Sequence, residues 1–184
     1  MAKIYDCTTN DFVKTAVRHR SDITRSRKKA KRDKNFSETK NKEFIDFCKA
    51  TGLRKQELKC LRGTQLIYKN GIHYIAVTSG AKGEKYRECP IISNVEAIIK
   101  RMNEAGIGKV WTYVPDMDVH SYRSEYCTEI YNTLARPIDK IPKKERYYCK
   151  KDLKGKCYDK RAMLIASRCL GHNRVSIIAE HYLR

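Results

Sequence analysis

The stretch Thr-Gly-Leu-Arg-Lys-Gln-Glu-Leu, residues 51–58, joins two amphipathic segments of the chain. Before it, residues 36–52 predict a helix with one apolar face that ends at Gly52. After it, the apolar spacing predicts a second helix. Arg54 falls in the first turn of that helix, where the helix dipole disfavours a cation. We therefore expect Arg54 to hold an anion, and a surface salt bridge to Glu57 is the alternative reading.

Strand-like runs follow these two helices. Residues 65–68 and 72–78 flank the pair Asn70-Gly71, which is a strong signal for a two-residue hairpin turn. A second turn leads into a third run at 84–91. These three runs predict a small antiparallel sheet.

Further helices are expected after the sheet, at 93–106, 118–135, 159–171 and 173–182. The residues expected to cap helices are Ser37, Ser93 (in a capping box), Asp118, Asp159 and Asn173. Residues 136–158 predict a loop with a short hairpin. The predicted fold class is therefore α+β, mostly helical, with a small three-stranded antiparallel sheet.

The charge of the chain favours a polyanionic partner. Among 184 residues, Lys and Arg number 40 and Asp and Glu 21, which gives a net charge of +19. Nucleic acid is the commonest polyanion that such a surface binds, and a merely basic surface is the alternative. The chain has no apolar run long enough to span a membrane and no apolar signal core, so we expect a cytoplasmic protein. Its eight cysteines lack zinc-site spacing and are expected to be reduced thiols.

Two basic segments carry most of this charge. Residues 14–34 hold ten basic and two acidic residues, and residues 136–161 hold eleven and four. We expect residues 1–34 to be a basic linker or the remnant of an N-terminal DNA-clamping domain. Residues 35–184 then form the main domain, with an inserted basic segment near 136–158. That insertion either contacts DNA backbone or is a simple surface insertion, and the sequence favours neither.

Four short motifs stand in a particular order along the chain. They are the 51–58 stretch, Ala81-Lys82-Gly83, His120-Ser121-Tyr122-Arg123, and Leu170-Gly171-His172 followed ten residues later by Tyr182. In this order they resemble the catalytic domain of the tyrosine recombinases, the phage and conjugative-transposon integrase family. The resemblance covers residues 36–184. It implies an enzyme that cleaves and rejoins DNA through a 3′-phosphotyrosine bond, to integrate or excise a mobile element.

The resemblance also implies roles for six residues. Arg54 and Arg123 would bind the scissile phosphate, since guanidinium groups match phosphate oxygens in pairs. His172 would donate to a phosphate oxygen, and His120 would accept the proton of the nucleophile or orient it. Lys82 would protonate the leaving 5′-oxygen, and the nucleophile would be Tyr182.

Each of these residues also has an ordinary alternative. Arg123 could be a solvated helix arginine, and His172 a core or capping histidine. Lys82 could be an exposed turn lysine, and any one of twelve tyrosines could serve only for packing. The interval from His172 to Tyr182 is one residue longer than is usual in the family.

The resemblance implies double-stranded DNA attachment sites as partners and a homotetramer on DNA, with a monomer in its absence. Accessory excision or DNA-bending proteins are possible partners, and no cofactor, metal or membrane is expected. The nearest enzyme alternatives are a type IB topoisomerase and a telomere resolvase. A non-catalytic or regulatory DNA-binding module that retains the fold, and a basic scaffold protein, are alternatives of another class.

Overall fold

The computed structural model describes residues 36–80, 86–150 and 153–183. Helices and strands are mixed, which confirms the predicted α+β class. The α-helices are α1 (Lys42–Thr51), α2 (Lys55–Cys60), α3 (Val95–Ala105), α4 (Val119–Leu134), α5 (Lys160–Cys169) and α6 (Val175–His181). The strands are β1 (Leu66–Lys69), β2 (Ile72–Val77), β3 (Arg87–Pro90), β4 (Arg146–Tyr148) and β5 (Cys157–Asp159). Short 3₁₀ turns are η4 (Gly63–Gln65), η6 (Ile138–Lys140) and η7 (Lys143–Glu145).

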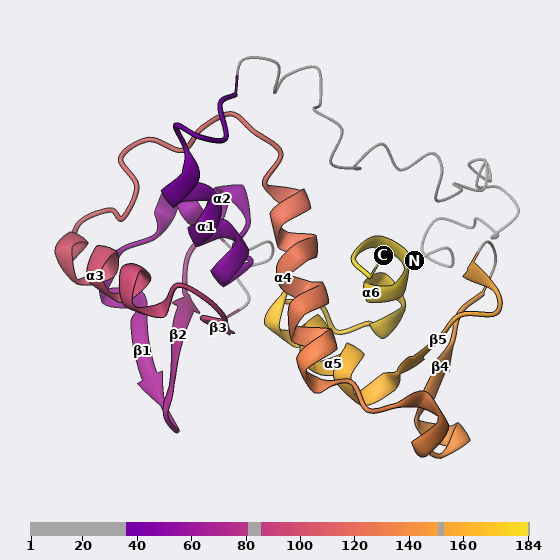
Figure 1. The fold of residues 1–184 in the computed structure, drawn as a ribbon. Coiled ribbons are helices and arrows are strands. Elements are labelled where there is room, and N and C mark those ends of the chain that lie inside the picture. The colour runs from indigo at the N-terminus through magenta and orange to yellow at the C-terminus, as the bar shows by residue number, and fades with distance from the viewer. Residues whose placement is uncertain (1–35, 81–85, 151–152, 184) are drawn as a thin grey trace, which may run out of the picture.

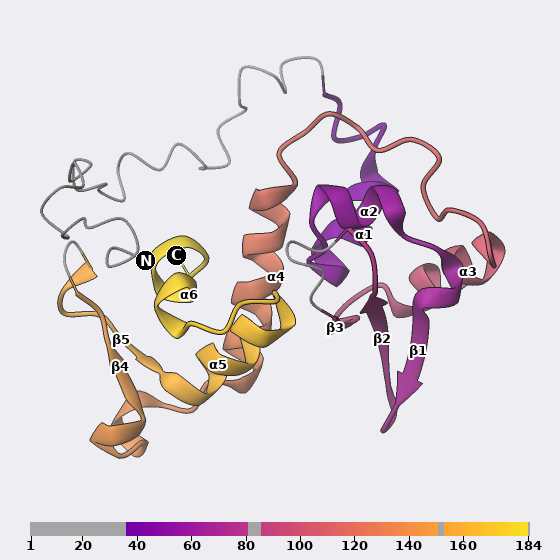
Figure 2. The ribbon, with the colours of Figure 1, turned by 180° about the vertical axis from the view of Figure 1, so that it is seen from behind.

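The described chain has two hydrophobic cores, one on each side of α4. Figure 1 shows α1, α2, α3 and strands β1 to β3 on one side, and α6 with β4 and β5 on the other. The view from behind in Figure 2 shows the same division. Buried Leu58 and Ile75 belong to the first core, and buried Met163 and Ile178 to the second. Because α4 packs on both α1 and α5, it joins the two halves.

The three-stranded sheet is antiparallel in the order β1-β2-β3. Ile75 lies opposite Leu66 on one side and opposite Cys89 on the other, and both Ile75 and Cys89 are fully buried. The turn between β1 and β2 has positive φ at Asn70 and Gly71, of 50° and 79°. These are the angles of the hairpin turn that the sequence predicts. The predicted third strand is confirmed over Arg87–Pro90, and its residues 84–85 lie outside the described chain.

A second, two-stranded antiparallel sheet lies within the basic segment of residues 136–161. Strands β4 and β5 pair Tyr147 with Tyr158 and Tyr148 with Cys157. This confirms the short hairpin predicted for residues 136–158. Because β5 leads directly into α5, the hairpin is attached to the second core.

Two of the predicted helix caps are confirmed. The Asp118 carboxylate accepts a hydrogen bond from the backbone N–H of His120 at the start of α4. The Asp159 carboxylate does the same for Arg161 at the start of α5. Gly52 ends α1 in the left-handed conformation, as predicted.

Three other predicted caps are wrong. Ser37 accepts from Lys40 in a turn that precedes α1, and Asn41 is the N-cap residue of that helix. Asn94 has a left-handed φ of 48°, so α3 begins only at Val95 and the Ser93 capping box does not form. At α6 the N-cap is Arg174 in place of Asn173. In each case the loop before the helix follows a path that the local sequence pattern does not reveal.

Candidate functional site

A buried carboxylate organises the start of α2. Glu57 is 2% exposed, and it accepts from the backbone N–H of Arg54 at 2.6 Å and from Arg54 Nη1 at 2.8 Å. Arg54 is therefore the N-cap of α2, one residue earlier than the predicted first turn. The predicted alternative of a salt bridge to Glu57 is correct as a contact, but the bridge is not on the surface.

Arg87 on β3 is the second partner of this carboxylate. Its Nη1 and Nη2 donate to the two oxygens of Glu57 at 2.6 and 2.5 Å, and its Nε donates to the Cys169 carbonyl at 3.2 Å. The pairing is bidentate, which is the strongest arrangement of these two groups. Sequence reasoning missed Arg87. The available signal was its two-residue spacing from Cys89, which puts a cation on the inner face of the strand.

Arg123 joins the two halves of the molecule. It lies on α4, is 2% exposed, and donates to the Gly52 carbonyl and to the Leu170 carbonyl. Arg54 Nη2 also donates to the Leu170 carbonyl, at 3.0 Å across 116 residues of sequence. Two of the predicted phosphate-binding residues thus meet at a single oxygen atom.

The positions of these two carbonyls follow from helix ends. Gly52 is the C-cap of α1 and Leu170 is the C-cap of α5. Carbonyls at helix ends lack partners within their helix and carry the negative end of the helix dipole, so a guanidinium stabilises both. Gly52 has φ +59°, and a Cβ there would lie 2.2 Å from Cδ1 of Tyr126. Glycine is therefore required where the Arg123 contact forms.

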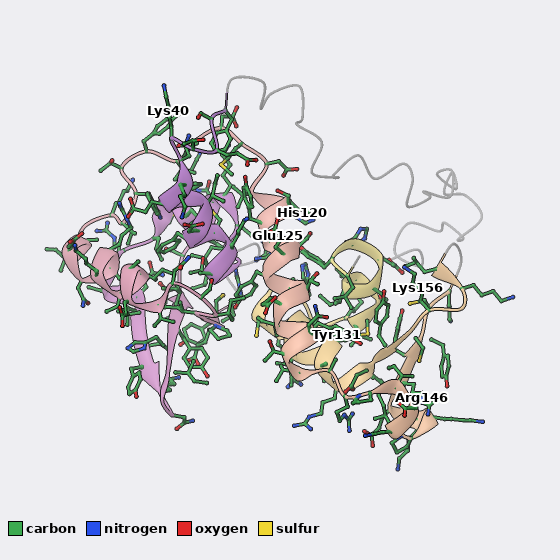
Figure 3. The ribbon with its side chains drawn as sticks, viewed as in Figure 1. Lys40, His120, Glu125, Tyr131, Arg146 and Lys156 are labelled. Atoms are coloured by element: carbon green, nitrogen blue, oxygen red, sulfur yellow. The ribbon has the colours of Figure 1, made fainter. Side chains whose placement is uncertain are left out.

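Tyr182 lies beside this arginine cluster. Its hydroxyl is 3.1 Å from Nε2 of His172 and 3.5 Å from Nε of Arg123. The His120 ring, near the start of α4 in Figure 3, has its centroid 5.1 Å from that of Tyr182. The predicted final helix extends one residue too far at its C-terminal end, because α6 ends at His181 and Tyr182 is its C-cap. The structure thus brings together Arg54, Arg123, His120, His172 and Tyr182, whereas Lys82 lies outside the described residues.

The arginine cluster carries more positive than negative charge. Burial alone raises the pKa of Glu57, but the hydrogen bonds and charge of Arg87 outweigh it and hold that pKa at about 2. Burial lowers the pKa of Arg123. Burial and the nearby guanidinium groups lower the pKa of His172 from 6.5 to about 4, so its ring is neutral at pH 7. Three guanidinium groups therefore face one carboxylate, and the excess positive charge suits an anion.

Comparisons of the chain with protein-family models, with curated proteins and with solved structures found no match. Across the described residues, no helix is both long and apolar enough to cross a membrane. Nor does the described chain gather three or more His, Cys, Asp or Glu side chains in the manner of a metal site. The seven described cysteines are all free thiols. The arginine cluster with Tyr182 is accordingly the arrangement on which we base a function.

Proposed function

We propose that this protein is a site-specific DNA recombinase or integrase of the tyrosine recombinase type, with residues 35–184 as its catalytic domain. It would cleave and rejoin double-stranded DNA at attachment sites, as a homotetramer on two sites. One observation carries the proposal: the Tyr182 hydroxyl is within 3.5 Å of both His172 and Arg123. These residues belong to motifs that the resemblance assigns to one active site.

The arginine pair supports a phosphodiester as the substrate. Arg54 and Arg123 both reach the Leu170 carbonyl, so their guanidinium groups are separated by a single oxygen atom. Two oxygens of one phosphate fit that separation. In a dry site, preorganised donors stabilise the charge that builds on those oxygens during in-line attack. The proposal assigns this stabilisation to the guanidinium groups and uses no metal.

The proposed step is a transesterification. Tyr182 Oη attacks phosphorus and forms a P–O bond, and the bond to the 5′-oxygen breaks. The tyrosine proton passes to a base, and the leaving oxygen takes a proton from Lys82, a role that rests on the resemblance alone. Rejoining is the reverse step, so the phosphodiester energy is kept in the protein–DNA bond. No external energy source is needed.

The base in this proposal is His172. Its Nε2 is at hydrogen-bond distance from Tyr182 Oη, and its lowered pKa leaves it able to accept a proton at pH 7. The resemblance assigns the accepting role to His120, whose ring also borders Tyr182. Comparing His172→Ala with His120→Ala separates the two: loss of the acidic limb of the pH–rate profile, where the base becomes protonated, should follow the true acceptor.

A second candidate function is a non-catalytic DNA-binding module with the same fold. It is favoured by the burial of Tyr182, which is 4% exposed, and by the protein acceptors that occupy all three nitrogens of Arg123. The neighbouring groove of about 520 Å³ is lined by Arg87, Arg168 and Gly171 among others, and Tyr182 is not part of that lining. Catalysis therefore requires α6 to shift when DNA binds.

The test is a suicide-substrate assay. The substrate is a nicked duplex carrying the end of the mobile element, incubated with the chain and resolved on a denaturing gel. A slow-migrating, protease-sensitive band is expected with the wild type and with Tyr68→Phe, an exposed tyrosine far from the cluster. It should be absent with Tyr182→Phe. If the wild type binds the same duplex but gives no band, catalysis is rejected in favour of the non-catalytic module.

A further inference from the structure

The hairpin of the inserted segment is fixed by a single arginine. Arg136 pairs with Glu145 at 2.8 Å and with Asp159, whose side chain is fully buried, at 2.8 Å. Asp159 also caps α5, and its backbone N–H donates to the Tyr131 hydroxyl on α4. Its pKa is held low chiefly by the hydrogen bond from Arg136. The base of the hairpin is thus tied to α4 and α5, two helices of the second core.

Two acidic residues of this segment are used to pair with Arg136. Of the acidic residues described between 136 and 161, only Asp139 is not paired with Arg136. The exposed lysines described between residues 136 and 158 form no ion pair with a described carboxylate. They are Lys140, Lys143, Lys144, Lys150, Lys154 and Lys156. Figure 3 labels Arg146 on β4 and Lys156 just before β5, at the edge of the molecule farthest from the three-stranded sheet.

In the first half of the molecule, several surface cations pair with carboxylates. There Lys42 pairs with Asp46, Lys69 with Glu88 and Arg101 with Glu43. A surface whose charge serves only solubility mixes both signs in this way. The hairpin instead presents exposed positive charges, and its base is tied to α4 and α5.

We propose that this hairpin surface, formed by η6, η7, β4, β5 and the described residues between these two strands, is a second binding site for the phosphate backbone of duplex DNA, separate from the arginine cluster. The inference rests on the proposed function for the identity of the polyanion. Duplex DNA presents about one phosphate charge per 1.7 Å of axis, and this dense negative charge suits a group of lysines without ion pairs better than the scattered carboxylates of a protein. These contacts would hold and align the duplex without reading its sequence.

The fold sets the distance between the two sites. Strand β5 runs directly into α5, and the carbonyls at the far end of α5 hold Arg87, Arg123 and Arg54. A helix of 10 residues is about 15 Å long. Along a duplex, 15 Å corresponds to about four or five base pairs, at about 3.4 Å per base pair, and we expect the hairpin to contact backbone at about that distance from the scissile phosphate.

The test measures how DNA binding depends on salt. The variant Lys144→Gln/Lys154→Gln/Lys156→Gln is compared with Lys40→Gln/Lys59→Gln/Lys100→Gln, which removes three exposed lysines from the first half of the molecule. Both are made in the Tyr182→Phe chain, so that binding is measured without cleavage. Each lost phosphate contact lowers the slope of log K against log salt by about 0.9. We expect the hairpin variant to lose about two to three in slope and the control less than one.

Two further measurements complete the test. On a duplex that ends about three base pairs from the cleavage position, the hairpin variant should bind as well as its parent. In a chain with Tyr182 intact, the hairpin substitutions should raise the DNA concentration that gives half the maximal rate of adduct formation. Equal slopes for the hairpin variant and its parent, or equal losses in hairpin and control variants, would overturn the inference. If the slope falls but no adduct forms in wild type, only the proposed catalysis fails.

Discussion

Replacing the buried carboxylate, Glu57→Gln, perturbs the cluster with almost no change of shape. Glutamine fills the same volume and can still accept from one guanidinium nitrogen. It cannot accept from both nitrogens of Arg87, and its amide group would face a donor. The variant leaves Arg87, whose side chain is 6% exposed, without a counter-charge in the interior.

The magnitude follows from the pair geometry. Arg87 Nη2 and Glu57 Oε2 are 2.5 Å apart, and two unit charges about 4 Å apart interact by about 4 kcal/mol at an effective dielectric of about 20. Measured losses on breaking one side of a buried pair are about 3–5 kcal/mol. We therefore expect Glu57→Gln to lower the free energy of unfolding by about 3–4 kcal/mol.

The assay is urea unfolding at pH 7, arranged as a double-mutant cycle with Arg87→Met. Removing both charges leaves no buried charge unpaired between the two positions, so the double variant should be more stable than the sum of the single losses predicts. We expect a coupling free energy of at least about 2 kcal/mol. A loss below about 1 kcal/mol for Glu57→Gln, or additive losses, would refute the view that this pair organises the cluster.

The remaining predictions concern the Gly52 contact and the state of His172. Gly52→Ala should cost at least about 2 kcal/mol, because its Cβ would lie 2.2 Å from the Tyr126 ring in addition to the positive φ. The control Gly71→Ala, which also has positive φ but no atom within 4 Å of its Cβ, should cost only about 1 kcal/mol in thermal unfolding. Folding lowers the pKa of His172 from 6.5 to about 4, so between these pH values the unfolded chain binds a proton that the folded chain does not. The free energy of unfolding should therefore fall as the pH drops from 6.5 to 4. The full shift corresponds to about 3 kcal/mol, and we expect about 1–2 because the ring is partly solvated. In His172→Gln that part of the slope should disappear, and an unchanged slope between pH 6.5 and pH 4 would contradict the assignment.

Local chemistry explains which parts of the fold could be predicted. Asn70-Gly71 fits its turn because both positions need positive φ. Asp118 and Asp159 cap helices because a carboxylate just before the first turn accepts from the backbone N–H groups that lack partners there. Gly52 ends α1 because its left-handed conformation is costly for other residues.

The parts that could not be predicted depend on distant partners. Arg87 is held by Glu57 and by a carbonyl 82 residues away, and neither partner is visible in the local pattern. The sequence predicts Arg54 at the start of α2, but its contact with Leu170 spans 116 residues. Hydrophobic periodicity places the final helix but does not reveal that Tyr182 is buried beyond its end.

The five described residues of the predicted site come together because two helix ends are held by shared arginines. Motif order alone suggested their common role. The geometry adds the charge balance around Glu57 and the contact between His172 and Tyr182. Neither feature can be read from residue spacing.

The most direct measurement is to locate the covalent bond itself. The chain is trapped on the nicked duplex, digested with protease and nuclease, and analysed by mass spectrometry for a peptide that carries a residual nucleotide. The proposal predicts a 3′-phosphonucleotide on Tyr182 and on no other tyrosine. An adduct on a different residue would contradict the proposed site. A duplex that is bound but never joined to the protein would contradict the proposed activity.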